Sequence, residues 1–210
     1  MVVNFDQAPK ETKSPSKLAH VVLRTNNFSP MVEFYRTFLG AKTTYENDSL
    51  AFLTYDEEHH RIAIVGMPDI EDKNPKMCGL DHIAFAFDTL EDLLLAYRQR
   101  QTSGINPVWS VNHGPTSSIY YLDPDENQVE TQVDNFDTVE AANEFMGSKF
   151  FAENPLGTDF DPEELIRRLN SGETEELVKR RIEIGPRGLD DVPMREDASY
   201  RGKRATRTAN

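Results

Sequence analysis

An internal repeat constrains the fold of this 210-residue chain more than any other feature of its sequence. Aligning Leu18-Ala19-His20 with Leu80-Asp81-His82 gives an offset of 62 residues (80 minus 18), and the same offset places Tyr35-Arg36 on Tyr97-Arg98. Self-similarity at a fixed spacing is typical of two copies of one structural unit. The chain is therefore expected to fold as a pair of similar units.

Each copy has the pattern of one strand, one helix and three further strands, which is a βαβββ unit. We expect the first helix to be capped by Ser29, with Pro30 in its first position, and the second to be capped by Thr89. The units are expected at residues 18–67 and 80–134, with later strands near 41–47, 50–55, 60–66, 105–111, 117–122 and 127–133. This order predicts an α+β domain over residues 18–136.

Three side chains of metal-ligand type lie in short apolar runs that read as strands. His20 stands in LAHVVLRT, His82 in LDHIAFAF and Glu130 in IYYLDPDENQVETQ. A lone histidine in such a run is usually a core residue, but two at matching places in a repeat, with a carboxylate closing the second copy, indicate a metal site. Two histidines and one carboxylate hold a divalent metal, most often ferrous iron, and leave coordination positions open. A carboxylate in an apolar strand also has to be paired or coordinated.

The alternation of side chains along a strand places small residues beside His82. His82, Ala84 and Ala86 share one face of their strand, whereas Ile83, Phe85 and Phe87 share the other. The bulky face is expected to pack on a helix. A cavity is therefore expected on the His82 face.

The run Asp123–Asn127 is a strong turn pattern between two strands. A hairpin centred on Asp125 pairs Tyr120 directly with Glu130, and a slip of one residue would substitute Tyr121. We therefore expect the Tyr120 side chain to lie beside Glu130.

These segments resemble the vicinal oxygen chelate superfamily, and within it the type I extradiol ring-cleaving dioxygenases. The resemblance covers about residues 17–136 and rests on HVVL, HHRIAIVG, LDHIAF, the step His113-Gly114 and IYYLDPDENQVE. It implies paired βαβββ units that form a cupped, incompletely closed mixed sheet around a metal. In such hairpins a glycine often follows the DP-acid step, and Glu126 replaces it here, so we expect a less tight turn.

The resemblance also implies roles for individual residues. His60, in His60-Arg61-Ile62-Ala63, matches the family's acid-base histidine, although strand parity leaves His59 as an alternative. Tyr120 would hydrogen-bond a substrate oxygen, and His113 would orient the substrate or stabilise charge. Glyoxalase-type members use a carboxylate from each unit, and overlaying the units places Ala63 where Glu130 stands, so only three ligands remain.

The implied function is ring cleavage of a catechol-type diol with O2 by an Fe(II) enzyme, with Mn(II) as an alternative metal. Two other functions stay open: a metal-dependent isomerase, lyase or hydrolase on the same scaffold, and a metal-free protein that sequesters a ligand as bleomycin-resistance proteins do. Metal content and oxygen uptake distinguish these hypotheses.

Charge and hydropathy restrict the partners and the compartment. The net charge of -13 argues against nucleic acid or an anionic membrane as a partner. No apolar run approaches the ~20 residues of a membrane span, and the only cysteine, Cys78, rules out an intramolecular disulfide. We expect a cytoplasmic protein, and the exposed sheet edges and an apolar helix after residue 134 favour a homodimer.

The regions outside the repeat have different compositions. Residues 1–17 are polar and predict a disordered leader, and residues 186–210 predict a disordered tail. Between them, residues 137–185 predict a helical extension, with VEAANEFMGSKFF as one helix and Asp161-Pro162 opening another.

Overall fold

The computed structural model describes residues 10–74 and 77–193 of the chain. The first unit contains β1 (Val21–Thr25), α1 (Phe28–Leu39), β2 (Lys42–Glu46), β3 (Leu50–Thr54) and β4 (Ile62–Gly66). The second contains β5 (His82–Phe87), α2 (Leu90–Thr102), β6 (Trp109–Asn112), β7 (Thr116–Leu122) and β8 (Gln128–Asp134). Both copies therefore have the predicted βαβββ order.

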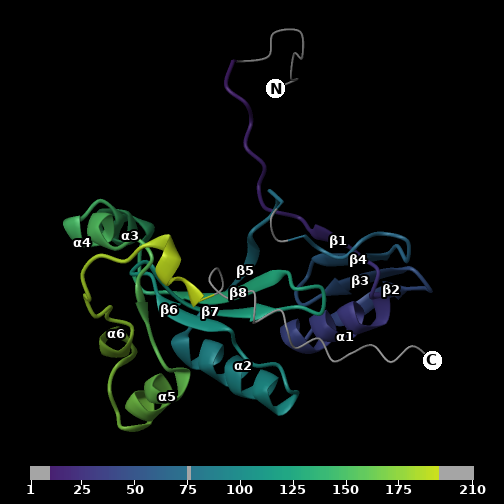
Figure 1. The fold of residues 1–210 in the computed structure, drawn as a ribbon. Coiled ribbons are helices and arrows are strands. Elements are labelled where there is room, and N and C mark those ends of the chain that lie inside the picture. Colours follow the sequence, from purple (N-terminus) through teal and green to yellow (C-terminus); the bar gives the residue numbers. More distant parts are fainter. Residues whose placement is uncertain (1–9, 75–76, 194–210) are drawn as a thin grey trace.

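The two units form two mixed sheets, neither of which closes on itself (Figure 1). The first sheet has four strands in the order β1-β4-β3-β2. The second follows the same order with β5-β8-β7-β6, and adds a fifth edge strand, β9 (Thr158–Asp159), from beyond the repeat. In each unit the first and last strands are parallel neighbours. The predicted α+β class and open sheets are confirmed.

The strand registers of the two sheets correspond residue by residue. In the first sheet Val22 pairs with Ala63, and in the second Ala84 pairs with Glu130. Val22 and Ala84 are separated by the repeat offset of 62 residues (84 minus 22). Ala63 therefore occupies in the first unit the place that Glu130 occupies in the second, as the overlay of the sequences predicts.

Local sequence accounts for the ends of the two long helices. The side chain of Thr89 accepts a hydrogen bond from the Asp92 backbone and caps α2 as predicted. The predicted cap of α1 is wrong by two residues: Asn27 stands at the N-cap without a side-chain hydrogen bond, and Ser29 lies inside the first turn. Gly40 ends α1 in the left-handed conformation (φ 60°), which a residue without a side chain adopts easily.

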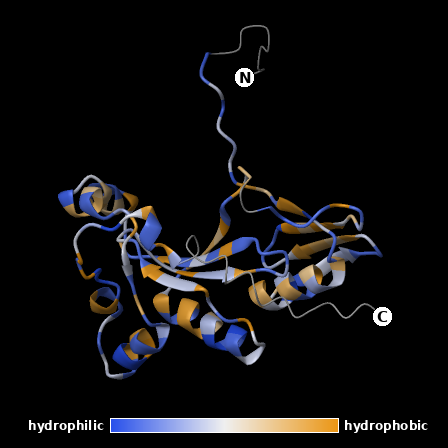
Figure 2. Ribbon diagram, in the orientation of Figure 1, coloured by the Kyte–Doolittle hydropathy of each residue, from blue (hydrophilic) through white to orange (hydrophobic). Residues whose placement is uncertain are grey.

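The two units share one apolar core between their sheets and helices. Helix α1 buries Met31, Val32, Tyr35 and Phe38, and α2 buries Leu90, Leu93, Leu94 and Tyr97. The Phe38 ring meets the Tyr121 ring of β7 edge-on at 5.0 Å. Figure 2 shows apolar residues along both sheets and on the helices that flank them. Ile83, Phe85 and Phe87 pack against this core whereas Ala84 and Ala86 are exposed, so the predicted faces of β5 are confirmed.

The turn between β7 and β8 is closed despite its missing glycine. Glu126 adopts φ 64°, in the region that favours glycine, and its N–H donates to the Asp123 carbonyl at 2.9 Å. The Asp123 carboxylate accepts from the N–H groups of Asp125 and Asn127 and from the Tyr35 hydroxyl of α1. The expectation of a looser turn is therefore wrong, because these contacts hold Glu126 in an unfavourable backbone conformation.

The chain beyond β8 forms an extension around the outer edge of the second sheet. It contains α3 (Val139–Met146), α4 (Lys149–Glu153), β9, α5 (Pro162–Asn170) and α6 (Glu175–Val178). The single helix expected over VEAANEFMGSKFF is wrong: it breaks at Gly147, and Ser148 caps the second piece. Asp161 caps α5 with Pro162 in its first turn, as predicted.

Parts of the predicted leader and tail lie outside the described residues, at 1–9 and 194–210. Residues 10–17 are exposed and carry no helix or strand. The segment after residue 186 forms a 3-10 turn, η2 (Leu189–Asp191), and Val192 packs on Trp109 and Tyr120. The packed part of the chain therefore continues past residue 185.

None of the helices within residues 10–74 and 77–193 is long and apolar enough to cross a membrane.

Candidate metal centre and active site

Two of the three predicted metal ligands meet on neighbouring parallel strands. The register of β5 with β8 brings the His82 Nε2 atom to 2.9 Å from the Glu130 Oε2 atom. Glu130 is only 4% exposed, so its carboxylate relies on this contact. The other ring nitrogen of His82, Nδ1, lies 2.8 Å from an Asp81 oxygen. A carboxylate on the far nitrogen is how many metal-binding histidines are oriented.

The pair is an ion pair when no metal is present. The hydrogen bond with Glu130 raises the pKa of His82 to about 9, against the effect of partial burial and with help from Asp81. Burial acts to raise the pKa of Glu130, but hydrogen bonds with His82 and Ser118 outweigh it and hold the pKa below its usual range. A metal that binds here would have to displace the proton of His82.

Tyr120 and His113 stand next to this pair. Tyr120 pairs with Glu130 across β7 and β8, in the register predicted from the hairpin. Its ring meets the His82 ring edge-on at 5.5 Å, and its hydroxyl lies 3.1 Å from the His113 Nε2 atom. Burial and the neighbouring Glu130 carboxylate raise the pKa of Tyr120, which therefore remains a neutral hydrogen-bond donor. Burial lowers the pKa of His113, which favours its neutral form near pH 7.

His20 and His60 form a second group in the first unit. His20 directly precedes β1 and is exposed, and its ring lies 4.4 Å from the His60 ring. His60 also stacks on Phe52 at 4.5 Å with an interplanar angle of 13°. The His59 ring contacts that of His60, with their Nδ1 atoms 2.6 Å apart, but His59 has no ring contact with His20 among the described residues and 70% of its side chain is exposed. Proximity to His20 thus favours His60 over His59 as the inner histidine.

The two groups are not joined into one ligand set. Within the described ranges there is no cluster of three or more His, Cys, Asp or Glu side chains that could hold a metal ion. His82, Glu130, Tyr120 and His113 lie together, and His20 and His60 lie together. The role of His20 as the third ligand therefore stays a prediction.

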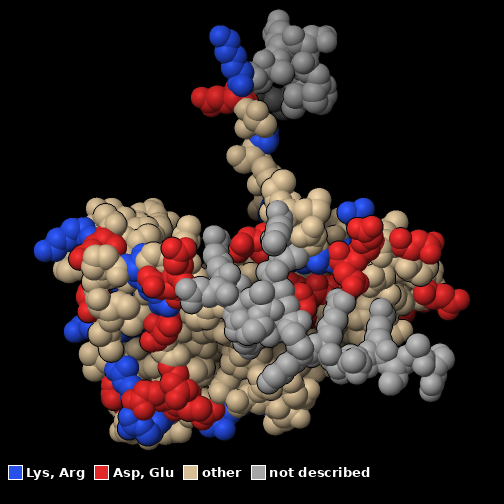
Figure 3. All heavy atoms as spheres, in the orientation of Figure 1, with Lys and Arg blue, Asp and Glu red and all other residues tan. Residues whose placement is uncertain are grey.

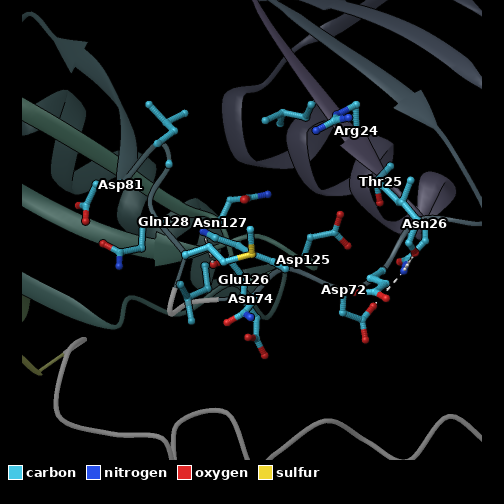
Figure 4. Close-up of a pocket in the computed structure, with 18 of the residues that line it drawn as sticks. Arg24, Thr25, Asn26, Asp72, Asn74, Asp81, Asp125, Glu126, Asn127 and Gln128 are labelled. Carbon is cyan, nitrogen blue, oxygen red and sulfur yellow. Dashed lines mark hydrogen bonds between the residues drawn. The ribbon is translucent and has the colours of Figure 1, made fainter.

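A cavity of about 860 Å³ opens between β1, the segment after β4 and the β7–β8 turn. Figure 4 shows Asp81 and Gln128 on one side of it and Arg24, Thr25 and Asn26 on the other. Arg24 shares the strand face of His20, and Gln128 shares that of Glu130, because alternate residues of a strand point the same way. None of the six candidate site residues lines this cavity; Val22, Asp81 and Gln128 are lining residues that lie within two positions of His20, His82 and Glu130 in the sequence.

Comparisons with known proteins agree with this architecture. The family model of the Glyoxalase/Bleomycin resistance protein/Dioxygenase superfamily matches residues 17–131. The chain belongs to this superfamily.

Two curated relatives come from Rhodococcus globerulus. Biphenyl-2,3-diol 1,2-dioxygenase 2 is 45% identical over 157 residues, which cover 74% of this chain and 83% of the relative. Biphenyl-2,3-diol 1,2-dioxygenase 3 is 43% identical over 167 residues, which cover 78% and 88%. Among solved structures, a lactoylglutathione lyase from Agrobacterium tumefaciens is 18% identical with a TM-score of 0.48, over 58% of this chain and 96% of that chain.

The structure adds residues around Tyr120 and His113 that the sequence alone does not reveal. Trp109 stacks on Tyr120 at 5.1 Å and donates to Asp159 of β9, and Arg187 pairs with the same carboxylate. Arg181, from the end of the extension, donates to the His113 carbonyl. No local pattern marks these residues, since each acts through a partner more than 25 positions away in the sequence.

Figure 3 shows acidic side chains spread over both units and the extension on the face in view. Glu71, Asp72, Asp81, Asp125 and Glu126 line the cavity, against Arg24 and Lys73 as the cations. The cavity lining is thus net acidic, which suits a neutral substrate better than an anionic one.

Proposed function

We propose that this chain is a metal-dependent extradiol dioxygenase that cleaves the ring of a catechol-type aromatic diol with O2. The observation that carries the proposal is the identity of 43–45% with two biphenyl-2,3-diol dioxygenases over about three quarters of the chain. The arrangement of His82, Glu130, Tyr120 and His113 on one sheet face supports it, because these groups can bind a metal and handle protons beside it.

The donor chemistry fits a divalent metal. The buried Glu130 carboxylate and the His82 Nε2 atom face one another, and His20 would supply a second imidazole from the first unit. Fe(II) is the metal we propose, with Mn(II) as the alternative, because both accept two histidines and one carboxylate. Bound iron would supply the redox chemistry that no side chain of this site can perform.

The remaining residues have roles in binding and proton transfer. The neutral Tyr120 hydroxyl, whose hydrogen is directed at His113, would accept a hydrogen bond from a protonated oxygen of the substrate diol. His113 lies behind it, with its Nε2 atom 3.1 Å from the Tyr120 hydroxyl, and would help to orient the substrate or stabilise charge. His60 would accept a proton from the diol, because burial and the neighbouring His20 lower its pKa and favour the neutral ring that can act as a base.

The cavity has room for a substrate larger than a single ring. A volume of about 860 Å³ lies at the upper end of the range of small-molecule sites. We therefore propose a diol with a second ring, as in the substrate named for the relatives, which would extend from the ligand-bearing faces into the cavity. A homodimer and a cytoplasmic location stay proposals as well.

Oxygen consumption tests the proposed function. Protein purified anaerobically and loaded with Fe(II) should take up O2 with biphenyl-2,3-diol and more slowly with catechol. Glu130→Ala should lose both metal binding and uptake, because the buried carboxylate is a ligand. An iron-loaded protein that consumed no O2 with any diol would refute the activity, and full metal retention by Glu130→Ala would refute the ligand set.

A further inference from the structure

The C-terminal extension encloses the loop that carries His113. Gly157 approaches this loop with φ 93°, and a Cβ at Gly157 would lie 2.7 Å from the His113 Cα atom and collide with the Asn112 carbonyl oxygen. On the other side, a Cβ at Gly114 would overlap the Phe145 ring of α3. Only glycine fits either position. The His113 loop is thus held between two parts of the extension.

One contact from the extension determines which ring nitrogen of His113 carries the proton. The Nδ1 atom lies 2.7 Å from the Leu156 carbonyl oxygen, and a carbonyl can only accept. Nδ1 therefore carries the hydrogen. In the neutral ring Nε2 is then bare, and it accepts the hydrogen bond of the Tyr120 hydroxyl at 3.1 Å.

Two buried polar side chains fix the turn at residues 154–157, which contains Leu156 and its carbonyl. Asn154 is 1% exposed and closes the turn onto Gly157 through both of its side-chain groups, at 2.8 and 3.1 Å. Arg181 has a side chain that is only 2% exposed and donates to the His113 carbonyl at 3.1 Å and to the Asn154 carbonyl at 2.8 Å. One guanidinium thus connects the turn of the extension to the backbone of His113.

We propose that Asn154 and Arg181 are positioning residues that fix His113 as its Nδ1-protonated tautomer, with Nε2 directed at Tyr120 and the substrate. The proposal rests on the proposed function only for the role of His113 in the reaction. The tautomer itself is a property of the folded chain. The extension then contributes to the geometry of the active site, although it lies beyond the segment that the superfamily model matches, which ends at residue 131.

Nitrogen-15 NMR of the histidine rings tests the tautomer without any activity measurement. The chain has five histidines, so His113→Gln identifies the signals of His113 by their loss. We expect the Nδ1–H tautomer in the full metal-free chain and again after loading with zinc, which is diamagnetic. A dominant Nε2–H tautomer would overturn the proposal, whatever the enzyme does with diols.

Arg181→Met tests the positioning role, with Arg167→Met as the matched control. Both arginines lie in the extension and pair with a glutamate, but Arg167 is exposed and contacts no part of the His113 loop. We expect Arg181→Met to give mixed tautomers and to lower kcat roughly 10- to 100-fold with a smaller change in KM, because misplacement of a reacting group acts on the rate. Arg167→Met should match the wild type.

Arg181→Lys and Asn154→Ala separate positioning from general stability. Lysine keeps a donor for the carbonyls, so it should restore the Nδ1–H tautomer and part of kcat. Asn154→Ala should reproduce the mixed tautomers of Arg181→Met at a temperature where its melting curve shows it folded. If folded Arg181→Met or folded Asn154→Ala kept a single Nδ1–H tautomer and full kcat, the positioning role would be wrong. If no diol is turned over, the proposed function fails while the tautomer measurements still decide this inference.

Discussion

The proton shared by His82 and Glu130 makes the stability of the metal-free protein depend on pH. The hydrogen bond with Glu130 raises the pKa of His82 to about 9, above the ordinary value of 6.5. The folded state therefore binds this proton more tightly, and the stabilisation is complete below about pH 6.5 and is lost as the pH rises through about 9.

We expect the melting temperature of the metal-free protein to fall between pH 6.5 and 9, and His82→Gln to lack this part of the dependence. Metal affinity should change in the opposite direction and rise with pH, since the metal needs the neutral imidazole. Differential scanning calorimetry of both proteins across this range gives the comparison. Parallel curves for wild type and His82→Gln would contradict the ion pair.

Adjacent tyrosines on β7 provide a matched test of the active-site face. Tyr120 faces His113 and Glu130, whereas Tyr121 is fully buried on the opposite face against Phe38. Tyr120→Phe should lower kcat/KM on the order of 100-fold, a typical loss when a group that interacts with a transferring proton is removed. Tyr121→Phe should leave the kinetics unchanged. Equal effects of the two changes would show that the hairpin register does not define the site.

At the scale of the elements, the clearest difference between the two units is that β4 has Ala63 where β8 has Glu130. Ala63 is 2% exposed and shares the strand face of His20, in the place that Glu130 takes in the second unit. A carboxylate at position 63 would give four protein ligands, as in the glyoxalase-type members of the superfamily. It would then occupy a coordination position of the metal that O2 would need.

We expect Ala63→Glu to retain metal more strongly against a chelator and to consume less O2 than the wild type. Ala63→Gln controls for the added volume, because glutamine has nearly the same size and shape as glutamate but carries no charge. Ala63→Gln should not increase metal retention. Metal analysis after dialysis and oxygen-electrode traces provide the measurement. Stronger retention by both variants would mean that packing, and not ligation, causes the effect.

The elements that the sequence predicts correctly depend on local patterns. The repeat follows from self-similarity at one fixed offset, the faces of β5 follow from strand alternation, and the pairing of Tyr120 with Glu130 follows from one turn. The cap of α1 was missed because Ser29 and Pro30 fit the first turn as well as the cap. The contacts of His113 with Leu156 and Arg181 were missed because they join loops that carry no periodic pattern.

At the scale of the whole molecule, the two sheets are separate but their core is continuous. Phe38 of α1 lies against Tyr121 of the second unit, and Arg100 of α2 stacks its guanidinium 3.9 Å from the Phe38 ring centroid. Arg100 also donates to the Phe38 carbonyl at 2.9 Å and to Thr131 at 3.3 Å. The faces that carry His20 in the first unit and His82 and Glu130 in the second are therefore held in relation to one another by these contacts.

A contiguous core predicts that both units unfold together. Phe38→Ala, at a site 2% exposed, should lower the free energy of unfolding by about 3–5 kcal/mol. The single tryptophan, Trp109, lies in the second unit and reports on that unit alone, while far-UV circular dichroism reports on both. In urea the two signals should shift to the same lower midpoint, although the substituted residue belongs to the first unit.

Phe150→Ala is the control for the loss of an aromatic ring, because Phe150 is 43% exposed on α4 and is not part of these contacts. It should change stability far less than Phe38→Ala. A Trp109 transition that stayed in place while the circular dichroism midpoint fell would show that the units unfold independently. The contacts at Phe38 would then be too weak to fix His20 relative to His82 and Glu130, and a ligand set drawn from both units would need another means of assembly.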